Sequence, residues 1–171
     1  MILEFNGKKP RIDESSYIAH NSTLIGNITV SENVLILFGA VCRADFNHIL
    51  IGPGSCVQEN VVLNPMPDEP IIIERESIIG YGGIIHGGTI EKGSFIGAGT
   101  IILHDVIIGS ESIVAASSMI TAGTKVPPRS LVAGTPGKVI RELKDSDIEW
   151  IKRGVKGYQK MLPEYKRITS E

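Results

Sequence analysis

The fold is decided by residues 90–126, which read IEKGSFIGAGTIILHDVIIGSESIVAASSMITAGTKV and carry an aliphatic residue at every sixth position. These positions are Ile90, Ile96, Ile102, Ile108, Val114, Ile120 and Val126. A period of six matches neither the 3.6-residue repeat of a helix nor the simple two-residue alternation of a strand. Hexapeptide repeats are typical of a parallel β-helix, in which short strands wind around a common core.

Shorter runs with the same period extend the pattern toward the N-terminus, over residues 12–36, 51–63 and 73–85. Three hexads make one coil of about 18 residues. Stacked coils lie about 4.8 Å apart, so the interior becomes a column of Ile, Val and Leu side chains. We therefore expect an all-β fold, a parallel β-helix over residues 1–142, followed by a C-terminal α-helix within 143–171.

Three segments interrupt the repeat. The register skips by three residues at 43–50 (RADFNHIL), where we expect an irregular joint. The Pro-rich segment 64–70 (NPMPDEP) cannot continue a strand ladder, so we expect a surface loop there. The segment 85–89 (IHGGT) is one residue short of a hexad. It is either a tolerated slip or a shaped site, and the presence of His86 favours a site.

The C-terminal segment changes to helical spacing. Its apolar stripe consists of Ile148, Ile151, Val155, Tyr158 and Leu162. The segment 146–149 (SDIE) predicts a capping box at the start of this helix, and Pro163 predicts its end. Gly154 and Gly157 each weaken such a helix by about 1 kcal/mol. The stripe must therefore pack on the flank of the β-helix or on a neighbouring subunit.

Composition excludes several classes of function. The chain has 171 residues, which is typical of one domain, and a formal net charge of −2. Its 17 basic residues are spread along the chain, so we expect no nucleic-acid partner. We also expect no membrane partner, because no apolar stretch reaches membrane-spanning length. Cys42 and Cys56 fit no metal or disulfide framework, which favours a cytoplasmic protein.

Several motifs go beyond the repeat: Arg43-Ala44-Asp45, QENVVLN at 58–64, IGYG at 79–82, IHGGT at 85–89 and VPPRSLVAGTPGKV at 126–139. In this order and spacing, from about residue 10 to the C-terminal helix, the chain resembles the gamma-class carbonic anhydrase family. These are left-handed β-helix proteins and include ferripyochelin-binding-like members. The resemblance implies a homotrimer with sites between adjacent subunits. In such a site three histidines hold zinc, whose bound water has a pKa near 7 and yields a hydroxide that attacks CO2.

The resemblance also implies roles for four residues near the metal. Arg43 and Asp45 match an Arg and an Asp that pair near the site and help to hold the subunits together. Gln58 matches the glutamine that hydrogen-bonds the zinc-bound water or bicarbonate. Glu59 stands where the family has an acidic residue, usually Asp, and is a candidate rim carboxylate or proton shuttle. These four residues are the candidate catalytic set.

The three zinc-ligand positions correspond to Asn64, Tyr81 and His86, of which only one is a histidine. Zinc prefers imidazole or thiolate, whereas an asparagine oxygen suits calcium or magnesium better. Ionising a tyrosine at pH 7 costs about 4 kcal/mol. We therefore expect zinc or another divalent metal to bind weakly or not at all, and CO2 hydration to be absent or very low. The polar cleft would instead suit a small anion such as bicarbonate or a carboxylate.

His104 is a further candidate metal ligand. Counting sides places Ile102 one coil beyond Ile85, so His104 would lie near His86, displaced by one residue. The two could then share a metal with Tyr81 of a neighbouring subunit.

Two other functions remain open. The first is an acyl-CoA-dependent acyltransferase, with His86 or His104 as the general base and residues 134–138 (GTPGK) near the CoA phosphates. The second is a structural subunit of a larger assembly.

Overall fold

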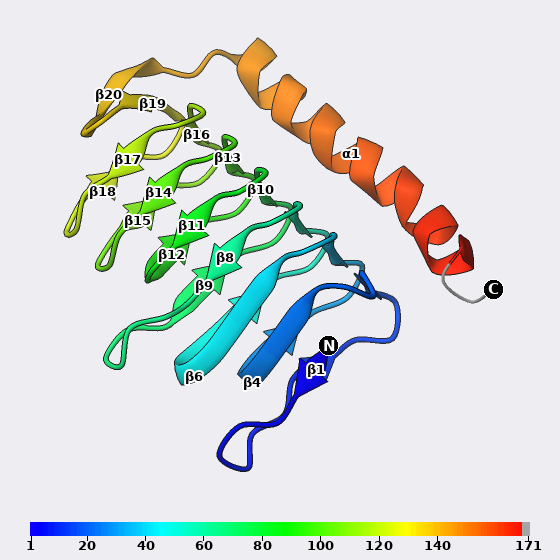
Figure 1. Cartoon of the computed structure of the whole chain (residues 1–171). Helices are drawn as coiled ribbons and strands as arrows, with labels where there is room; N and C mark the ends of the chain where they lie inside the picture. The colour runs from blue at the N-terminus through cyan, green and yellow to red at the C-terminus, as the bar shows by residue number, and fades with distance from the viewer. Residues whose placement is uncertain (169–171) are drawn as a thin grey trace.

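The computed structural model describes residues 1–168 and confirms a parallel β-solenoid flanked by one C-terminal helix, α1 (Asp145–Ile168) (Figure 1). Most strands are only two residues long, as hexads with tight corners require. Among the named strands, pairing is parallel except in the closing hairpin of β19 and β20. No helix within the described residues is long and apolar enough to cross a membrane.

The strands form two sheets. The larger one has twelve strands: β1 (Ile2–Leu3), β2 (Arg11–Ile12), β4 (Thr23–Val30), β6 (Val41–Ile51), β8 (Val62–Leu63), β9 (Ile71–Ile73), β11 (Ile84–Ile85), β12 (Gly88–Ile90), β14 (Ile101–Ile102), β15 (Ile107–Ile108), β17 (Met119–Ile120) and β18 (Lys125–Val126). The smaller one has eight: β3 (Tyr17–Ile18), β5 (Leu35–Ile36), β7 (Cys56–Val57), β10 (Ile78–Ile79), β13 (Phe95–Ile96), β16 (Ile113–Val114), β19 (Ser130–Gly134) and β20 (Gly137–Glu142). The long strand β6 joins the two flanks of the larger sheet.

The sixth-position aliphatic residues fill the interior, as the repeat predicts. All seven residues of the run from Ile90 to Val126 are at most 4% exposed. Equivalent residues stack in register, so that Ile85 pairs with Ile102 and Ile102 with Ile120. Burying such a side chain contributes about 1.5–3 kcal/mol. The stack of buried side chains is therefore what holds two-residue strands together.

The structure accommodates all three interruptions of the repeat. Gly26 pairs with Ala44 but Ile28 pairs with Ile49, which confirms the skip of three residues. The joint is nevertheless part of one continuous strand, β6, which carries the three extra residues between Ala44 and Ile49. The segment 64–70 leaves the ladder as a turn, as expected for its three prolines. The short segment 85–89 closes with five residues because Gly87 and Gly88 adopt φ values of 152° and 91°, which residues with a side chain rarely adopt.

Helix α1 runs back along the solenoid from the last coil toward the first and covers the eight-stranded sheet (Figure 1). Its buried residues are Ile148, Ile151, Val155 and Leu162, which cluster with the outward side chains of that sheet. Near its C-terminal end, Gln159 Nε2 donates hydrogen bonds to the carbonyl oxygens of Asn33 (2.9 Å) and Gly54 (3.0 Å). Of the two predicted docking surfaces for the stripe, the flank of the solenoid is therefore the one occupied.

Both predicted ends of this helix were wrong. The helix begins at Asp145, so Ser146 is a helical residue rather than the cap. The helix also passes through Pro163 and continues to Ile168. Proline removes one helical hydrogen bond, but packing beyond it compensates, because the ring of Tyr165 stacks on that of Tyr17 with centroids 5.1 Å apart. Tertiary contacts thus override the local stop signal.

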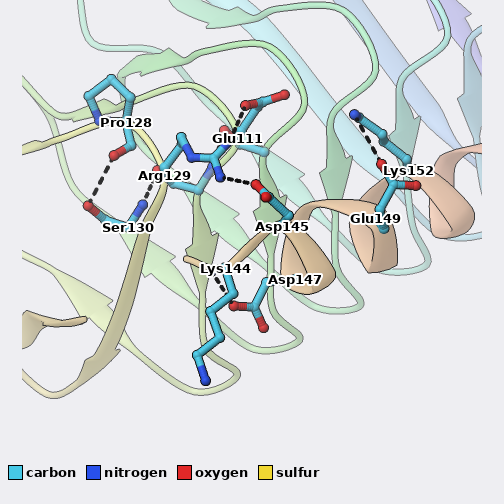
Figure 2. A network of polar contacts seen from close by, with 11 residues as sticks. Glu111, Pro128, Arg129, Ser130, Lys144, Asp145, Asp147, Glu149 and Lys152 are labelled. Atoms are coloured by element: carbon cyan, nitrogen blue, oxygen red, sulfur yellow. Dashed lines mark hydrogen bonds and ion pairs between the residues drawn. The ribbon is translucent and has the colours of Figure 1, made fainter. Parts of the chain in front are cut away.

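Ion pairs join the end of the solenoid to the start of α1 (Figure 2). Arg129, in the corner before β19, lies 2.6 Å from the Asp145 carboxylate and 3.5 Å from that of Glu111. Asp147 Oδ2 accepts a hydrogen bond from the backbone N–H of Lys144 at 2.8 Å, which caps the helix. The Arg141 guanidinium, 2.7 Å away, and this backbone contact lower the pKa of Asp147 to about 2.

We expect an Asp147→Asn variant to be slightly less stable than the parent chain at neutral pH. The folded-state pKa of Asp147 lies below its ordinary value of 3.8, so its contribution to stability is present above pH 4. That contribution is lost as the pH falls toward 2. Thermal unfolding followed by circular dichroism at pH 7, 4 and 2 should show a difference that vanishes at the lowest pH. A Glu149→Gln control should lack this pH dependence.

Candidate functional site

The first part of the site is the corner where β6 and β8 run side by side. Cys42 pairs with Leu63, which places Arg43 beside Asn64 on adjacent coils. Asn64 Oδ1 accepts a hydrogen bond from the Arg43 guanidinium at 2.8 Å, and Asn64 Nδ2 donates to the Arg43 carbonyl oxygen at 2.9 Å. Arg43 also pairs with Asp45, as the resemblance implies. The Asn64 amide is therefore fixed in orientation, with its oxygen facing a positive charge.

His86 lies one coil further along the same corner. Leu63 pairs with Ile85, and His86 Nδ1 lies 3.0 Å from the Asn64 carbonyl oxygen. That contact orients the half-buried ring and leaves its Nε2 outside the described hydrogen bonds. The Ile85–Ile102 pairing confirms the predicted register of His104, which is exposed.

The second part of the site lies at a different corner and includes a residue of the helix. Gln58 is buried, and its Oε1 accepts a hydrogen bond from the backbone N–H of Tyr81 at 3.0 Å. Gln58 Nε2 donates to the hydroxyl of Tyr158 in α1. The hydroxyls of Tyr81 and Tyr158 lie 3.5 Å apart. Burial, followed by the hydrogen bond to Tyr81, raises the pKa of Tyr158 above its ordinary value. Both ends of the Gln58 side chain are thus engaged inside its own subunit.

Glu59 lies next to this second corner. Its Oε2 is shielded from solvent and has no hydrogen-bond partner among residues 1–168. Pockets of about 280 and 230 Å³ flank Tyr81 and Tyr158, between α1 and the solenoid, and Glu59 lines the smaller one. Sequence reasoning placed Tyr158 in the apolar stripe of the helix but missed its contact with Gln58, which lies 100 residues away in the chain.

Tyr81 and His86 lie at opposite edges of one solenoid face. Tyr81 precedes β11 (Ile84–Ile85) and His86 follows it. Between these edges the outward side chains form a paired aliphatic row of Val41, Val62, Ile84, Ile101 and Met119. Helix α1 covers the other sheet, so this row is open in the single chain. The candidate ligand positions are therefore divided into two corners, and in one chain only Asn64 and His86 are in contact.

Known proteins share both the repeat and the fold. The family profile described as Bacterial transferase hexapeptide (six repeats) matches residues 87–122. A carbonic anhydrase of Geobacillus kaustophilus is 34% identical over all of this chain and 94% of its own length. A probable carbonic anhydrase of Methanocaldococcus jannaschii is 41% identical over 88% of this chain and 94% of its own length. The chain belongs to the gamma-class carbonic anhydrase-like family of hexapeptide-repeat proteins. The crystal structure of the BC4754 gene product of Bacillus cereus agrees with this fold, with 35% identity, a TM-score of 0.96, and coverage of 98% of this chain and 97% of that one.

The zinc-ligand positions of the carbonic anhydrase-like family do not fit zinc in this chain. A cation bound at Asn64 Oδ1 would lie beside the guanidinium that already donates to this oxygen. Tyr81 offers a phenol, and His86 alone offers an imidazole. Within the described part of one chain, no group of three or more His, Cys, Asp or Glu side chains is placed to hold a metal ion. No catalytic step through zinc follows from this set of donors.

Proposed function

We propose that this carbonic anhydrase-like protein is a homotrimer that binds a small anion, such as bicarbonate or a carboxylate, between subunits. In this proposal the zinc site has degenerated and CO2 hydration is very slow. The observation that carries it is the hydrogen bond from Arg43 to Asn64 Oδ1, because it directs a guanidinium at the residue that stands where the family has a metal ligand. The N–H donors of this guanidinium favour an anion over a cation beside Asn64, while Asp45 balances part of the charge of Arg43.

The placement of the two corners supports the trimer. Tyr81 and His86 border the same face, and an open aliphatic row lies between them. Packing around a three-fold axis would bury this row and bring Tyr81 of one subunit toward His86 of the next. Tyr81 is 53% exposed and Ile84 is 43% exposed in the single chain. Both fractions are high for large apolar side chains that no other subunit covers. Size-exclusion chromatography with light scattering should give three times the mass of the chain.

Three polar groups would contact the anion. The exposed Arg43 guanidinium supplies charge and a planar pair of N–H donors, which match a carboxylate or bicarbonate. His86 supplies the ring nitrogen that is not directed at Asn64. The Tyr81 hydroxyl would come from the neighbouring subunit. Asp45 holds Arg43 in place through their ion pair.

We expect an Arg43→Met variant to bind acetate and bicarbonate about 10–100-fold more weakly, because it loses charge-assisted hydrogen bonds worth about 1.5–3 kcal/mol. Isothermal titration calorimetry on the trimer measures this loss. The matched control is Arg153→Met, which removes an exposed arginine from α1 and should leave the affinity unchanged.

Elemental analysis of the unmodified protein provides the opposing test. One tightly bound zinc per site, together with rapid CO2 hydration in a stopped-flow assay, would refute the proposal. Titration with CoA in the same calorimeter tests the acyltransferase alternative, since a bound CoA would place the protein in that class.

A further inference from the structure

A pocket elsewhere in this chain has a chemistry opposite to that of the Arg43 corner. It has a volume of about 230 Å³ and lies between α1 and the coil that carries Glu59. Its lining consists of Leu37, Glu59, Tyr81, Gly154, Gly157, Tyr158, Met161 and Tyr165. Gly157 keeps the helix side open, because a Cβ atom there would meet nothing within 4 Å. The two glycines that weaken the helix therefore border a space that larger side chains would narrow.

Glu59 is the one charged group in that lining among the described residues. Its Oε2 is shielded from solvent and has no hydrogen-bond donor within residues 1–168. An unsatisfied buried carboxylate oxygen is costly unless a donor or a positive charge meets it. Burial above all raises the pKa of Tyr158 and of Tyr165, so both phenols stay neutral at physiological pH.

Three tyrosine rings and a carboxylate surround this space. Aromatic π systems attract organic cations, and the attraction strengthens when the cation is desolvated. The lining has no lysine, arginine or histidine among the described residues that would compete for Glu59. The volume lies below the 300–1,000 Å³ that is typical of drug-sized ligands, so it suits a fragment of a few heavy atoms.

We propose that this pocket binds a small protonated alkylamine, whose N–H groups donate to the Glu59 carboxylate once rotation about its terminal bond turns Oε2 from its shielded position toward the pocket. The charge and alkyl chain of the amine contact Tyr81, Tyr158 and Tyr165. A protonated amine satisfies the orphaned oxygen directly, which a quaternary ammonium cannot do because it has no N–H. The site goes beyond the proposed anion function, since neither Arg43 nor His86 lines it, and Tyr81 is the one residue that both proposals use. It assigns a binding role to Glu59 that is separate from the rim or proton-shuttle role implied by its sequence position.

Calorimetric titration with n-butylammonium chloride at pH 7 tests the assignment. We expect one amine per chain, and affinity at least tenfold lower for both n-butanol and butyltrimethylammonium. The Glu59→Gln variant keeps the shape but removes the charge, and should bind n-butylammonium at least tenfold more weakly. Glu4→Gln, at an exposed position, is the matched control and should bind like the parent chain.

Thermal unfolding supplies a second measurement. Glu59→Gln should fold with an equal or higher Tm, because it removes the charge of a half-buried carboxylate whose Oε2 is shielded and unpartnered among residues 1–168, and n-butylammonium should raise the Tm of the parent chain only. If that variant fails to fold, Tyr81→Leu removes an exposed wall of the pocket and should weaken amine binding instead. No binding to the parent chain, or equal binding to Glu59→Gln, would overturn the proposal. Arg43→Met should leave amine binding intact, which separates this result from that of the anion test.

Discussion

Replacing Asn64 and Tyr81 together by histidine is expected to convert this protein into one that holds one zinc per site. The double variant would present three imidazoles with His86, the set that zinc prefers. Asn64→His also removes the oxygen that Arg43 now contacts at 2.8 Å, so the guanidinium no longer faces a ligand atom. Structural zinc sites with four ligands bind with about 10–16 kcal/mol. Two added imidazoles should therefore raise zinc affinity on the order of a thousandfold or more.

Elemental analysis after dialysis, together with competition against a chelator of known affinity, measures this gain. The matched control is the double variant Asn64→Gln, Tyr81→Phe, which changes the same positions without adding an imidazole and should stay free of zinc. Each single histidine variant should bind zinc with intermediate strength. A trimeric double-histidine variant without zinc would contradict the idea that position 81 of one subunit meets position 86 of the next.

Catalysis need not return together with the metal. Gln58 Nε2 donates to the Tyr158 hydroxyl, and Gln58 Oε1 accepts from the backbone of Tyr81, so these two contacts hold the amide in its present orientation toward α1. Adding Tyr158→Phe to the double-histidine variant would release the amide nitrogen. We expect CO2 hydration to rise further in that triple variant, measured by stopped-flow with a pH indicator.

The coils were predictable because each hexad is a local signal that repeats. A buried residue at every sixth position can be recognised from Ile90 onward without any knowledge of distant contacts. The register skip near Ala44 was also visible, since it shifts the phase of the repeat. The resemblance then identified Asn64, Tyr81 and His86 as the zinc-ligand positions of the family.

The tertiary contacts between α1 and the site residues were not predictable from the sequence. The sequence places Tyr158 in a helical stripe, but only the docking of α1 on the sheet brings its hydroxyl to Gln58. The same docking explains why Pro163 does not end the helix, since Tyr165 beyond it stacks on Tyr17. The orphaned oxygen of Glu59 is likewise visible only once the helix has closed the pocket around it.

The short side at 85–89 depends on glycine, and Gly88→Ala is expected to destabilise the protein by about 3 kcal/mol or more. Gly88 adopts a φ of 91°, which an L-residue with a side chain rarely adopts. An added Cβ would also lie 2.2 Å from the Val106 carbonyl oxygen on the next coil. That oxygen belongs to the backbone of a buried stack, so it cannot move without disturbing the coil above.

Gly82→Ala is the control that separates the two causes. Gly82 also has a positive φ, 63°, but a Cβ atom there would meet nothing within 4 Å. Gly82→Ala should lower the free energy of unfolding only by the conformational penalty of about 1–2 kcal/mol. Urea unfolding of both variants at one protein concentration gives the comparison, since stability of an oligomer depends on concentration. An equal loss of unfolding free energy in the two variants would mean that the positive φ of Gly88, and not contact with Val106, limits substitution there. A larger loss for Gly88→Ala would mean that the five-residue side is held tight against its neighbouring coil, and that His86 is fixed in position by it.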